Sequence, residues 1–282
     1  VETRANGLTR VGLSQYALDN LELALPPEHE QRAIAEFLDE ETAKLDALVA
    51  EQQRLIALLR EKRQTVISES VTRGVAPHRS MVRSGVDWIG DIPEEWAIIS
   101  FLRCVSIAEG QVDPEDPQYA ALPLIAPNHI ESRTGRLLAV ETAEEQAAIS
   151  GKYFCRAGDV IYSKIRPALR KAVIAPFDCL CSADMYPLRP ARYLTAEYLH
   201  WLLLSDAFSA LALLESERVA MPKINRETLN EIRLPVPPRE EQDEIVAHIR
   251  ASIAPLDVLV GEAQRAVALL SERRAALISA AV

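Results

Sequence analysis

Two stretches of this 282-residue chain repeat each other at a distance of 211 residues (237 − 26). The first, LPPEHEQRAIAEFLDEETAKLDAL, covers residues 25–48, and the second, VPPREEQDEIVAHIRASIAPLDVL, covers residues 236–259. Both place a Pro-Pro pair and acidic residues ahead of regularly spaced apolar residues, a pattern typical of a helix N-terminus. The repeat constrains the fold because both copies should adopt one structure.

The first copy predicts a long spacer helix over residues 28–74, ending at Arg73-Gly74, where glycine suits a left-handed cap. From residue 34 onward, apolar residues recur in alternating steps of four and three, which average 3.5 and indicate the seam of a left-handed coiled coil. Such a helix needs a partner helix. The predicted seam residues are Ile34, Leu38, Leu45, Leu48, Leu55, Leu59 and Val66.

The second copy predicts a spacer helix over residues 239–282 that packs antiparallel to the first. Pro255 stands where the first copy has Lys44, so this helix should kink or restart there. Its predicted seam residues are Ile245, Ile249, Leu256, Leu259, Leu270 and Leu277.

The repeat extends backwards, since residues 13–27 align with residues 224–238. We therefore interpret residues 1–27 as the C-terminal tail of a truncated first globular unit, and the chain as a fragment or a natural half subunit. Residues 75–238 contain short apolar stretches of strand length and a buried helical pattern at 196–214. The fold class is α+β: one mixed α/β domain flanked by two long helices that form an antiparallel coiled coil.

The composition excludes several kinds of chemistry. The four cysteines are scattered, and Cys179 and Cys181 have the wrong spacing for zinc, so we expect no metal. Only ten glycines are present, and none forms a phosphate-binding or methyl-donor loop, which argues against a cofactor. The five histidines are dispersed, which argues against catalysis. Without an apolar membrane span or a secretion signal, cytoplasm is the expected location.

Charge is unevenly distributed along the chain. The net charge is −10, yet residues 151–192 contain eight basic and three acidic residues, a local balance of 8 − 3 = +5. An acidic protein with one basic region is suited to a localised anionic partner.

Two segments carry the residues that we expect to bind DNA. In GDVIYSKIRPALRKAVIA, residues 158–175, the cations could engage phosphates or guanine edges; the alternative is a solvated strand edge. In MPKINRE, residues 221–227, polar groups precede the last strand, and for the asparagine alone the spacing favours a cap or turn role over base reading. The candidate DNA-binding residues are Lys164, Arg166, Arg170, Lys171, Lys223 and Asn225.

Four phrases resemble the specificity subunits of type I restriction–modification systems. They are WIGDIPEEW (88–96), GDVIYSKIRPALRK (158–171), CSADMYPLRP (181–190) and LPVPPREEQ (234–242), in that family's order. The resemblance implies a target recognition domain that binds double-stranded DNA, two spacer helices, and partner methyltransferase and translocase-endonuclease subunits that supply catalysis. It also implies two recognition domains for a bipartite site, of which only one is complete here.

Other interpretations stay open at this point. The chain could be a half-specificity subunit acting as a homodimer, a structural coiled-coil adaptor, or a fusion of methyltransferase and recognition domain. The missing cofactor motifs argue against the fusion. The recognised bases cannot be derived from the sequence, because readout depends on side-chain placement.

Overall fold

The computed structural model describes residues 15–19, 25–216 and 223–281. These residues fall into two compact units, Leu55–Glu262 on the one hand and Val1–Arg54 with Ala263–Val282 on the other. We call the first the recognition unit and the second the distal unit. The predicted tail over residues 1–27 lies mostly outside the described residues, and within it Gln15–Asp19 form α1.

The two predicted long helices are confirmed as α2 (Glu28–Arg73) and α8 (Arg239–Ala281). Both carry acidic residues in the first turn, where the helix dipole favours negative charge. The first helix ends at Gly74, whose φ of 76° is the left-handed cap conformation that glycine adopts without strain. Among the described residues, neither long helix nor any shorter one is apolar enough over its length to cross a membrane.

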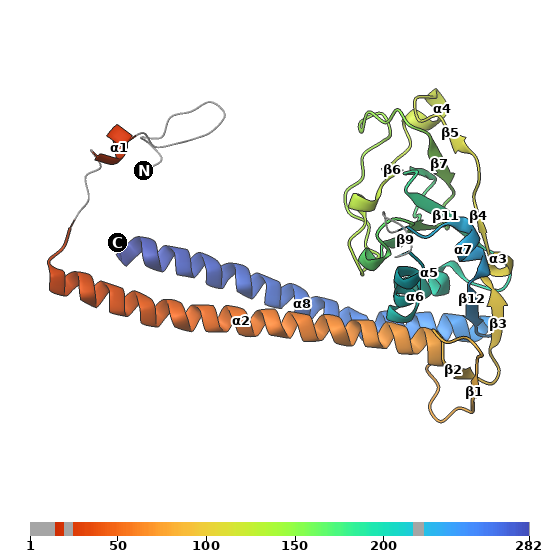
Figure 1. Ribbon diagram of the computed structural model, residues 1–282, viewed down its shortest axis with the longest axis horizontal. Coiled ribbons are helices and arrows are strands. Elements are labelled where there is room, and N and C mark those ends of the chain that lie inside the picture. The colour runs from red at the N-terminus through yellow and green to blue at the C-terminus, as the bar shows by residue number, and fades with distance from the viewer. Residues whose placement is uncertain (1–14, 20–24, 217–222, 282) are drawn as a thin grey trace. The chain divides into compact units, whose positions relative to one another are not determined.

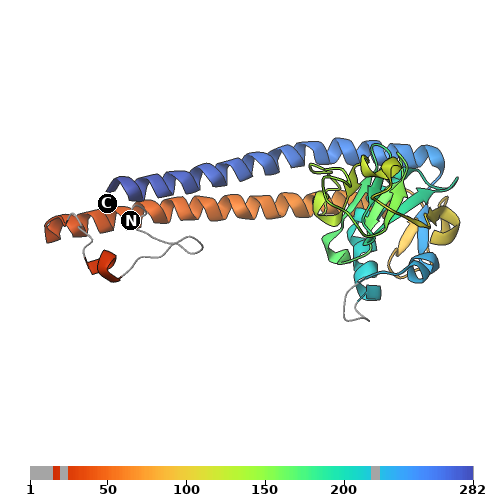
Figure 2. The same ribbon diagram turned by 90° about the horizontal axis from the view of Figure 1, so that it is seen from above.

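The antiparallel pairing of the helices is confirmed within the recognition unit. Arg63 Nε lies 2.9 Å from Asp257 Oδ1, and a Cβ on Gly74 would lie 2.8 Å from an oxygen of Glu241. As the residue number rises from 63 in α2 to 74 at its cap, the number of the neighbour in α8 falls from 257 to 241, so the two helices are antiparallel. Figure 2 shows the two helices running side by side.

Three predicted seam residues are not in the contact between the helices. Leu48, Leu55 and Leu259 are 46%, 42% and 45% exposed. The adjacent Ile56 is buried in place of Leu55. The remaining predicted seam residues are buried or half-buried, and they are Ile34, Leu38, Leu45, Leu59, Val66, Ile245, Ile249, Leu256, Leu270 and Leu277.

Burial along α2 follows a slightly longer spacing than the predicted heptad. The inward-facing positions of α2 are residues 34, 38, 41, 45, 49, 52, 56, 59, 63 and 67. Nine steps over 33 residues average about 3.7, which is the spacing of an 11-residue repeat rather than of a heptad. Inward positions 49, 56, 63 and 67 therefore lie one residue after the heptad positions 48, 55, 62 and 66, whereas positions 52 and 59 belong to both registers. The same shift exposes Leu259 in α8, where Val260 is half-buried.

The predicted restart at Pro255 does not occur, because α8 continues through it to Ala281. Proline removes one helical hydrogen bond and frees the carbonyl four residues earlier. Both Pro255 and Ala251 are exposed, so water can satisfy that carbonyl.

The described residues of the recognition unit form four sheets, two of them with four strands (Figure 1). One has the order β5-β7-β10-β6 and the other β4-β11-β8-β9, and all pairings are antiparallel except β10 with β6. Two-stranded sheets join β1 to β2 and β12 to β3. The strands are β1 (Met81–Arg83), β2 (Asp91–Pro93), β3 (Ala97–Ser100), β4 (Val105–Ile107), β5 (Gln111–Val112), β6 (Leu124–Ile125), β7 (Lys152–Cys155), β8 (Val160–Ser163), β9 (Ala172–Ile174), β10 (Cys179–Cys181), β11 (Met185–Pro190) and β12 (Arg233–Val236).

The predicted helix at 196–214 is two helices that meet at Ser205. The Ser205 hydroxyl donates to the Leu202 carbonyl and accepts from the Phe208 amide, so it ends one helix and starts the next. The short helical elements are α3 (Phe101–Cys104), α4 (Pro117–Ala120), η2 (Pro127–His129), η3 (Pro167–Leu169), α5 (Ala196–Leu204), α6 (Asp206–Ser216) and α7 (Arg226–Glu231).

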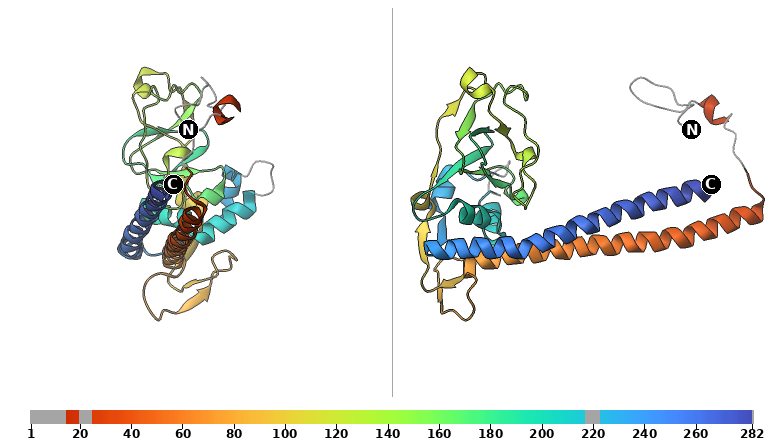
Figure 3. Two further views of the ribbon diagram at one scale, coloured as in Figure 1. Left: turned by 90° about the vertical axis from the view of Figure 1, so that its left-hand side faces the viewer. Right: turned by 180° about the vertical axis from the view of Figure 1, so that it is seen from behind.

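The main hydrophobic core joins the recognition domain to the helix ends. Ile67 of α2 and Ile245 of α8 are fully buried in the same cluster as residues of α5, α6 and the sheets. The Tyr198 hydroxyl donates towards the carbonyls of Val71 and Pro235, at 2.8 and 3.2 Å. The β1–β2 hairpin lies on the opposite side of the helix pair from the four-stranded sheets (Figure 3). The ends of both long helices therefore contribute side chains to the core of the recognition domain.

Candidate nucleic-acid interface

The structure brings together the two segments that the sequence predicts to bind DNA. An isolated antiparallel bridge pairs Ile165 with Lys223, and the Ile224 amide donates to the Lys164 carbonyl at 2.9 Å. The chain after β8 and the chain before α7 therefore lie side by side. Lys223 is exposed and Lys164 is half-buried, so both cations border one surface.

Two tyrosine rings lie against Lys164 and Arg226, which come from the same two segments. Lys164 Nζ is 5.0 Å from the ring centre of Tyr186, and Arg226 Cζ is 5.1 Å from the same ring and 5.7 Å from that of Tyr153. Such cation–aromatic distances are favourable. The Tyr186 ring is only 5% exposed, so only the half-buried Tyr153 offers a partly accessible ring of the kind on which nucleic-acid bases stack. Burial raises the pKa of Tyr186, so its phenol is neutral at physiological pH.

Arg226 is held in place by the backbone of a neighbouring strand. Its Nη2 donates to the Ala108 carbonyl at 2.9 Å, and its Nη1 lies 3.5 Å from Glu109 Oε1. This arginine therefore fixes the position of the cation–tyrosine stack. Sequence reasoning missed it and both tyrosines as site residues, although Arg226 directly follows Asn225 and Tyr186 stands in the phrase CSADMYPLRP.

Arg166 is the most accessible cation of the 164–171 segment. It is exposed, its φ is 47°, and none of the described residues pairs with its guanidinium. A left-handed conformation costs an arginine on the order of 1 kcal/mol, which makes the position a candidate functional one.

Arg170 and Lys171 have partners inside the protein. Arg170 Nη1 donates to Gln64 Oε1 at 3.0 Å and forms an ion pair with Asp206. Lys171 Nζ donates to the Pro127 carbonyl at 2.6 Å. Both cations thereby tie loops to their neighbours, as in the structural alternative for this segment. Their contact with DNA stays a prediction.

Asn225 caps α7. Its side-chain oxygen accepts a hydrogen bond from the Thr228 amide at 2.7 Å, the usual role of an asparagine at a helix N-cap. This is the alternative role that the sequence allowed. A direct contact of Asn225 with a base stays a prediction.

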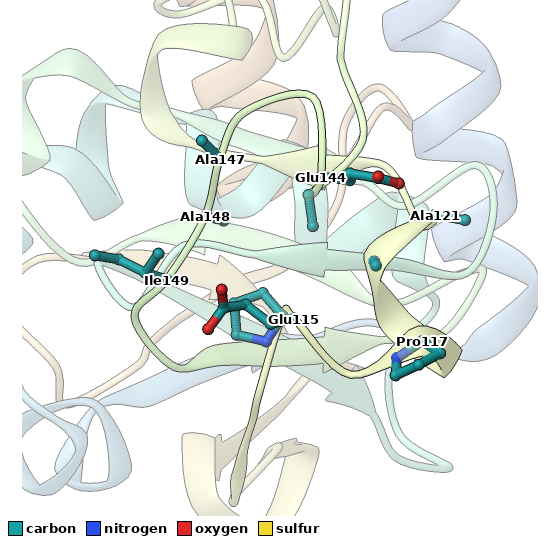
Figure 4. A pocket seen from close by; sticks show the side chains of 10 residues that line it. Glu115, Pro117, Ala121, Glu144, Ala147, Ala148 and Ile149 are labelled. Carbon is teal, nitrogen blue, oxygen red and sulfur yellow. The ribbon is translucent and has the colours of Figure 1, made fainter.

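A surface pocket elsewhere in the recognition unit does not suit an anion. It is lined mostly by alanine and proline side chains of residues 114–121 and 143–149, together with Glu115 and Glu144 (Figure 4). Two carboxylates disfavour phosphate by charge repulsion. Among the described residues, no group of three or more His, Cys, Asp or Glu side chains is arranged to hold a metal ion.

The sequence also matches known proteins. A family model described as the type I restriction modification DNA specificity domain matches residues 118–257. The specificity subunit of the type I restriction enzyme EcoDI from Escherichia coli is 31% identical over 279 residues, which cover 94% of this chain and 62% of that protein.

Two solved structures share the fold. A chain from a structure of the type I R-M system has a TM-score of 0.71 at 19% identity, covering 98% of this chain and 64% of its own. The HsdS subunit from Thermoanaerobacter tengcongensis has a TM-score of 0.50 at 18% identity, covering 99% and 65%. This chain spans less than two thirds of the length of each of these three proteins. By its sequence matches, this chain is similar over most of its length to the specificity subunits of type I restriction–modification systems.

Proposed function

We propose that the chain is a non-catalytic, sequence-specific DNA-recognition subunit of a type I restriction–modification complex in the cytoplasm. Residues 75–238 act as the target recognition domain, and residues 28–74 and 239–282 act as spacer helices. Double-stranded DNA is the ligand, and methyltransferase and restriction-translocase subunits are the protein partners. The 31% identity to a specificity subunit supports this role.

The observation that carries the proposal is the backbone pairing of the 164–166 segment with residues 223 and 224. It joins two cationic segments from distant parts of the sequence above the rings of Tyr153 and Tyr186. Lysine and arginine side chains bind phosphates and can also donate to base edges, so one surface offers both kinds of contact. In this proposal Lys164, Arg166 and Lys223 face the DNA.

The test is selection of binding sites from a pool of duplexes with a randomised centre. The full chain is assembled with the methyltransferase subunit of its own system, and bound duplexes are sequenced. A recognition subunit enriches one short motif, and Lys164→Gln or Lys223→Gln weakens binding to it. Lack of any enriched motif with a correctly assembled complex would contradict the proposal and favour a structural adaptor.

A second candidate is a half-specificity subunit that pairs with another copy of itself. In the distal unit, the Gln31 amide donates to the Pro26 carbonyl at 2.7 Å, which reproduces the bond from Gln242 to Pro237 at 3.0 Å in the recognition unit. The start of α2 therefore has the same local geometry as the start of α8, where the recognition domain joins its helix. The mass of the purified chain by sedimentation decides: a dimer supports this candidate, and a monomer at all concentrations rules it out.

A further inference from the structure

A cleft between α2 and a loop of the recognition unit is lined by arginines. Arg60 and Arg63 line it from α2, and residues 131–134 line it from the loop. Arg60 and Arg133 are exposed, whereas Arg63 is 5% exposed and donates to the Arg133 carbonyl at 3.0 Å. The cleft is lined by three arginines and one acidic residue, Glu131, a local balance of 3 − 1 = +2 in a chain whose net charge is −10.

The single acidic residue of the cleft does not cancel this charge towards solvent. Glu131 accepts bonds from Arg136 at 3.0 and 3.1 Å and from the Thr134 hydroxyl at 2.7 Å. Its carboxylate is therefore already paired within its own loop. Hydrogen bonds from Thr134 and Arg136 lower the pKa of this carboxyl group, and Arg60 adds a smaller electrostatic effect in the same direction. Among the described residues, neither Arg60 nor Arg133 forms a side-chain hydrogen bond or a close ion pair through its guanidinium group.

The cleft is continuous with the candidate DNA surface. The Arg133 amide donates to the Arg170 carbonyl at 3.2 Å, and the Ser132 hydroxyl donates to the Leu169 carbonyl at 2.6 Å. These bonds join the 131–134 loop to the loop that carries Arg166. The basic surface thus extends from Arg166 across Arg133 towards Arg60 of α2.

The backbone conformation points to a role for the side chains. Among the described residues only five non-glycine residues have positive φ, and three of them are Arg133, Arg166 and Arg170 in these two joined loops. A left-handed backbone costs an arginine free energy, so three such arginines in two joined loops mark these loops as candidate functional positions. Arg170 bonds to Gln64 and Asp206, whereas Arg133 and Arg166 are exposed to solvent.

We propose that Arg60 and Arg133 form a phosphate-binding site for the DNA backbone beside the bases that the Lys164–Lys223 surface reads. The site rests on the proposed function and extends the DNA contact from the recognition domain onto the spacer helix. Its ligand is a backbone phosphate, so it binds every sequence alike. Fixing of the Arg133 carbonyl by Arg63 and Gln64 holds the loop ready without reorganisation.

The experiment measures affinity of the full chain, assembled with its methyltransferase subunit, for a random-sequence 40-base-pair duplex over a range of KCl concentrations. Arg133→Asn removes the charge with a residue that tolerates a left-handed backbone, and Arg60→Gln keeps helix propensity. Lys62→Gln is the matched control, because Lys62 is an exposed cation of α2 that does not line the cleft. Thermal melting checks that each variant is folded.

Each arginine that contacts a phosphate contributes about 0.9 to the slope of log K against log salt. We expect Arg133→Asn and Arg60→Gln each to flatten the slope by about that amount, equally for random and selected duplexes, and Lys62→Gln to leave it unchanged. Folded variants with the parental slope would overturn the proposal. If Lys164→Gln weakens binding while both arginine variants keep the parental slope, only this site fails; if the parent binds no DNA, the proposed function fails.

Discussion

The recognition unit and the distal unit each contain one of two ion pairs that the repeat makes equivalent, and the two pairs differ in burial. Arg63 pairs with Asp257 in the recognition unit, and Arg274 pairs with Asp46 in the distal unit, each at 2.9 Å. The repeat relates them, since 63 + 211 = 274 and 46 + 211 = 257. The Arg63 side chain is 7% exposed and that of Arg274 is 42% exposed. The helix sequence sets the pairing, and the packed domain sets the burial.

A second pair of equivalent residues gives the same lesson. Gln242 is fully buried, accepts from the Thr195 amide and donates to the carbonyls of Tyr193 and Pro237. Gln31 keeps only its bond to Pro26 among the described residues and is exposed. Substitutions at equivalent positions should therefore have unequal effects.

The largest difference is expected between Ile67 and its equivalent Ile278. Ile67 is fully buried in the main core, whereas Ile278 is half-buried. Ile67→Ala should lower the free energy of unfolding by about 2–5 kcal/mol, because it leaves a cavity. Ile278→Ala should cost about 1 kcal/mol or less. Urea denaturation measures both, and equal losses would break the comparison.

Gln242→Ala should have the next largest effect. It leaves the buried Thr195 amide and two carbonyls without partners, which should cost about 2–3 kcal/mol. Gln31→Ala should cost less than about 0.5 kcal/mol, because water replaces its bond. Both variants can be followed by chemical denaturation of the full chain. A small loss for Gln242→Ala would mean that water reaches this position.

His200 makes the recognition unit sensitive to acid. Burial lowers the pKa of His200 to about 4, with smaller contributions from Arg63 and Arg250, against an opposing bond to the Ala172 carbonyl. In the unfolded chain the pKa is about 6.5, so below that pH the unfolded state takes up the proton first. Stability is therefore complete above pH 6.5 and is lost as pH falls towards 4. We expect a loss of about 2 kcal/mol between pH 7 and pH 5.

The control for this prediction is His200→Gln, which removes the titrating group. The readout is the difference in the free energy of unfolding between pH 7 and pH 5, and not the stability of the variant at a single pH. That difference should shrink markedly in the variant. An unchanged difference would assign the acid sensitivity to other groups.

The smallest effect is expected at Leu55, which is 42% exposed. Leu55→Gln should change the free energy of unfolding by less than about 0.5 kcal/mol, whereas Ile56→Ala, at an 8% exposed position, should cost about 2–4 kcal/mol. Denaturation of both variants compares the two helix registers directly. A larger loss of stability for Leu55→Gln than for Ile56→Ala would support the heptad register instead.

The sequence was sufficient to predict the long antiparallel helices and the mixed domain between them, because the repeat and its helix-start signals are local. The seam register was not predictable from spacing. Apolar residues occur in adjacent pairs, as at Leu48-Val49 and Leu55-Ile56, so both registers find apolar side chains. A spacing of 3.5 and one of about 3.7 diverge by one position only after several turns.

The candidate DNA surface was predictable in part. The cationic segments are visible in the sequence, but their partners are not, since Arg170 bonds to Gln64, which lies 106 residues earlier. The pairing of Ile165 with Lys223 is likewise a property of the fold. Charge alone therefore could not separate cations that face solvent from those that tie loops together.

The central claim is that DNA is read at the surface where the 164–166 and 223–226 segments meet. The most direct measurement is a double-mutant cycle with Lys164→Gln and Lys223→Gln, using affinity of the assembled complex for the selected duplex and for a scrambled one. We predict that each variant weakens binding at least several-fold and that their effects couple, because the two cations border one surface. Parental affinity and discrimination in the folded double variant would contradict the claim.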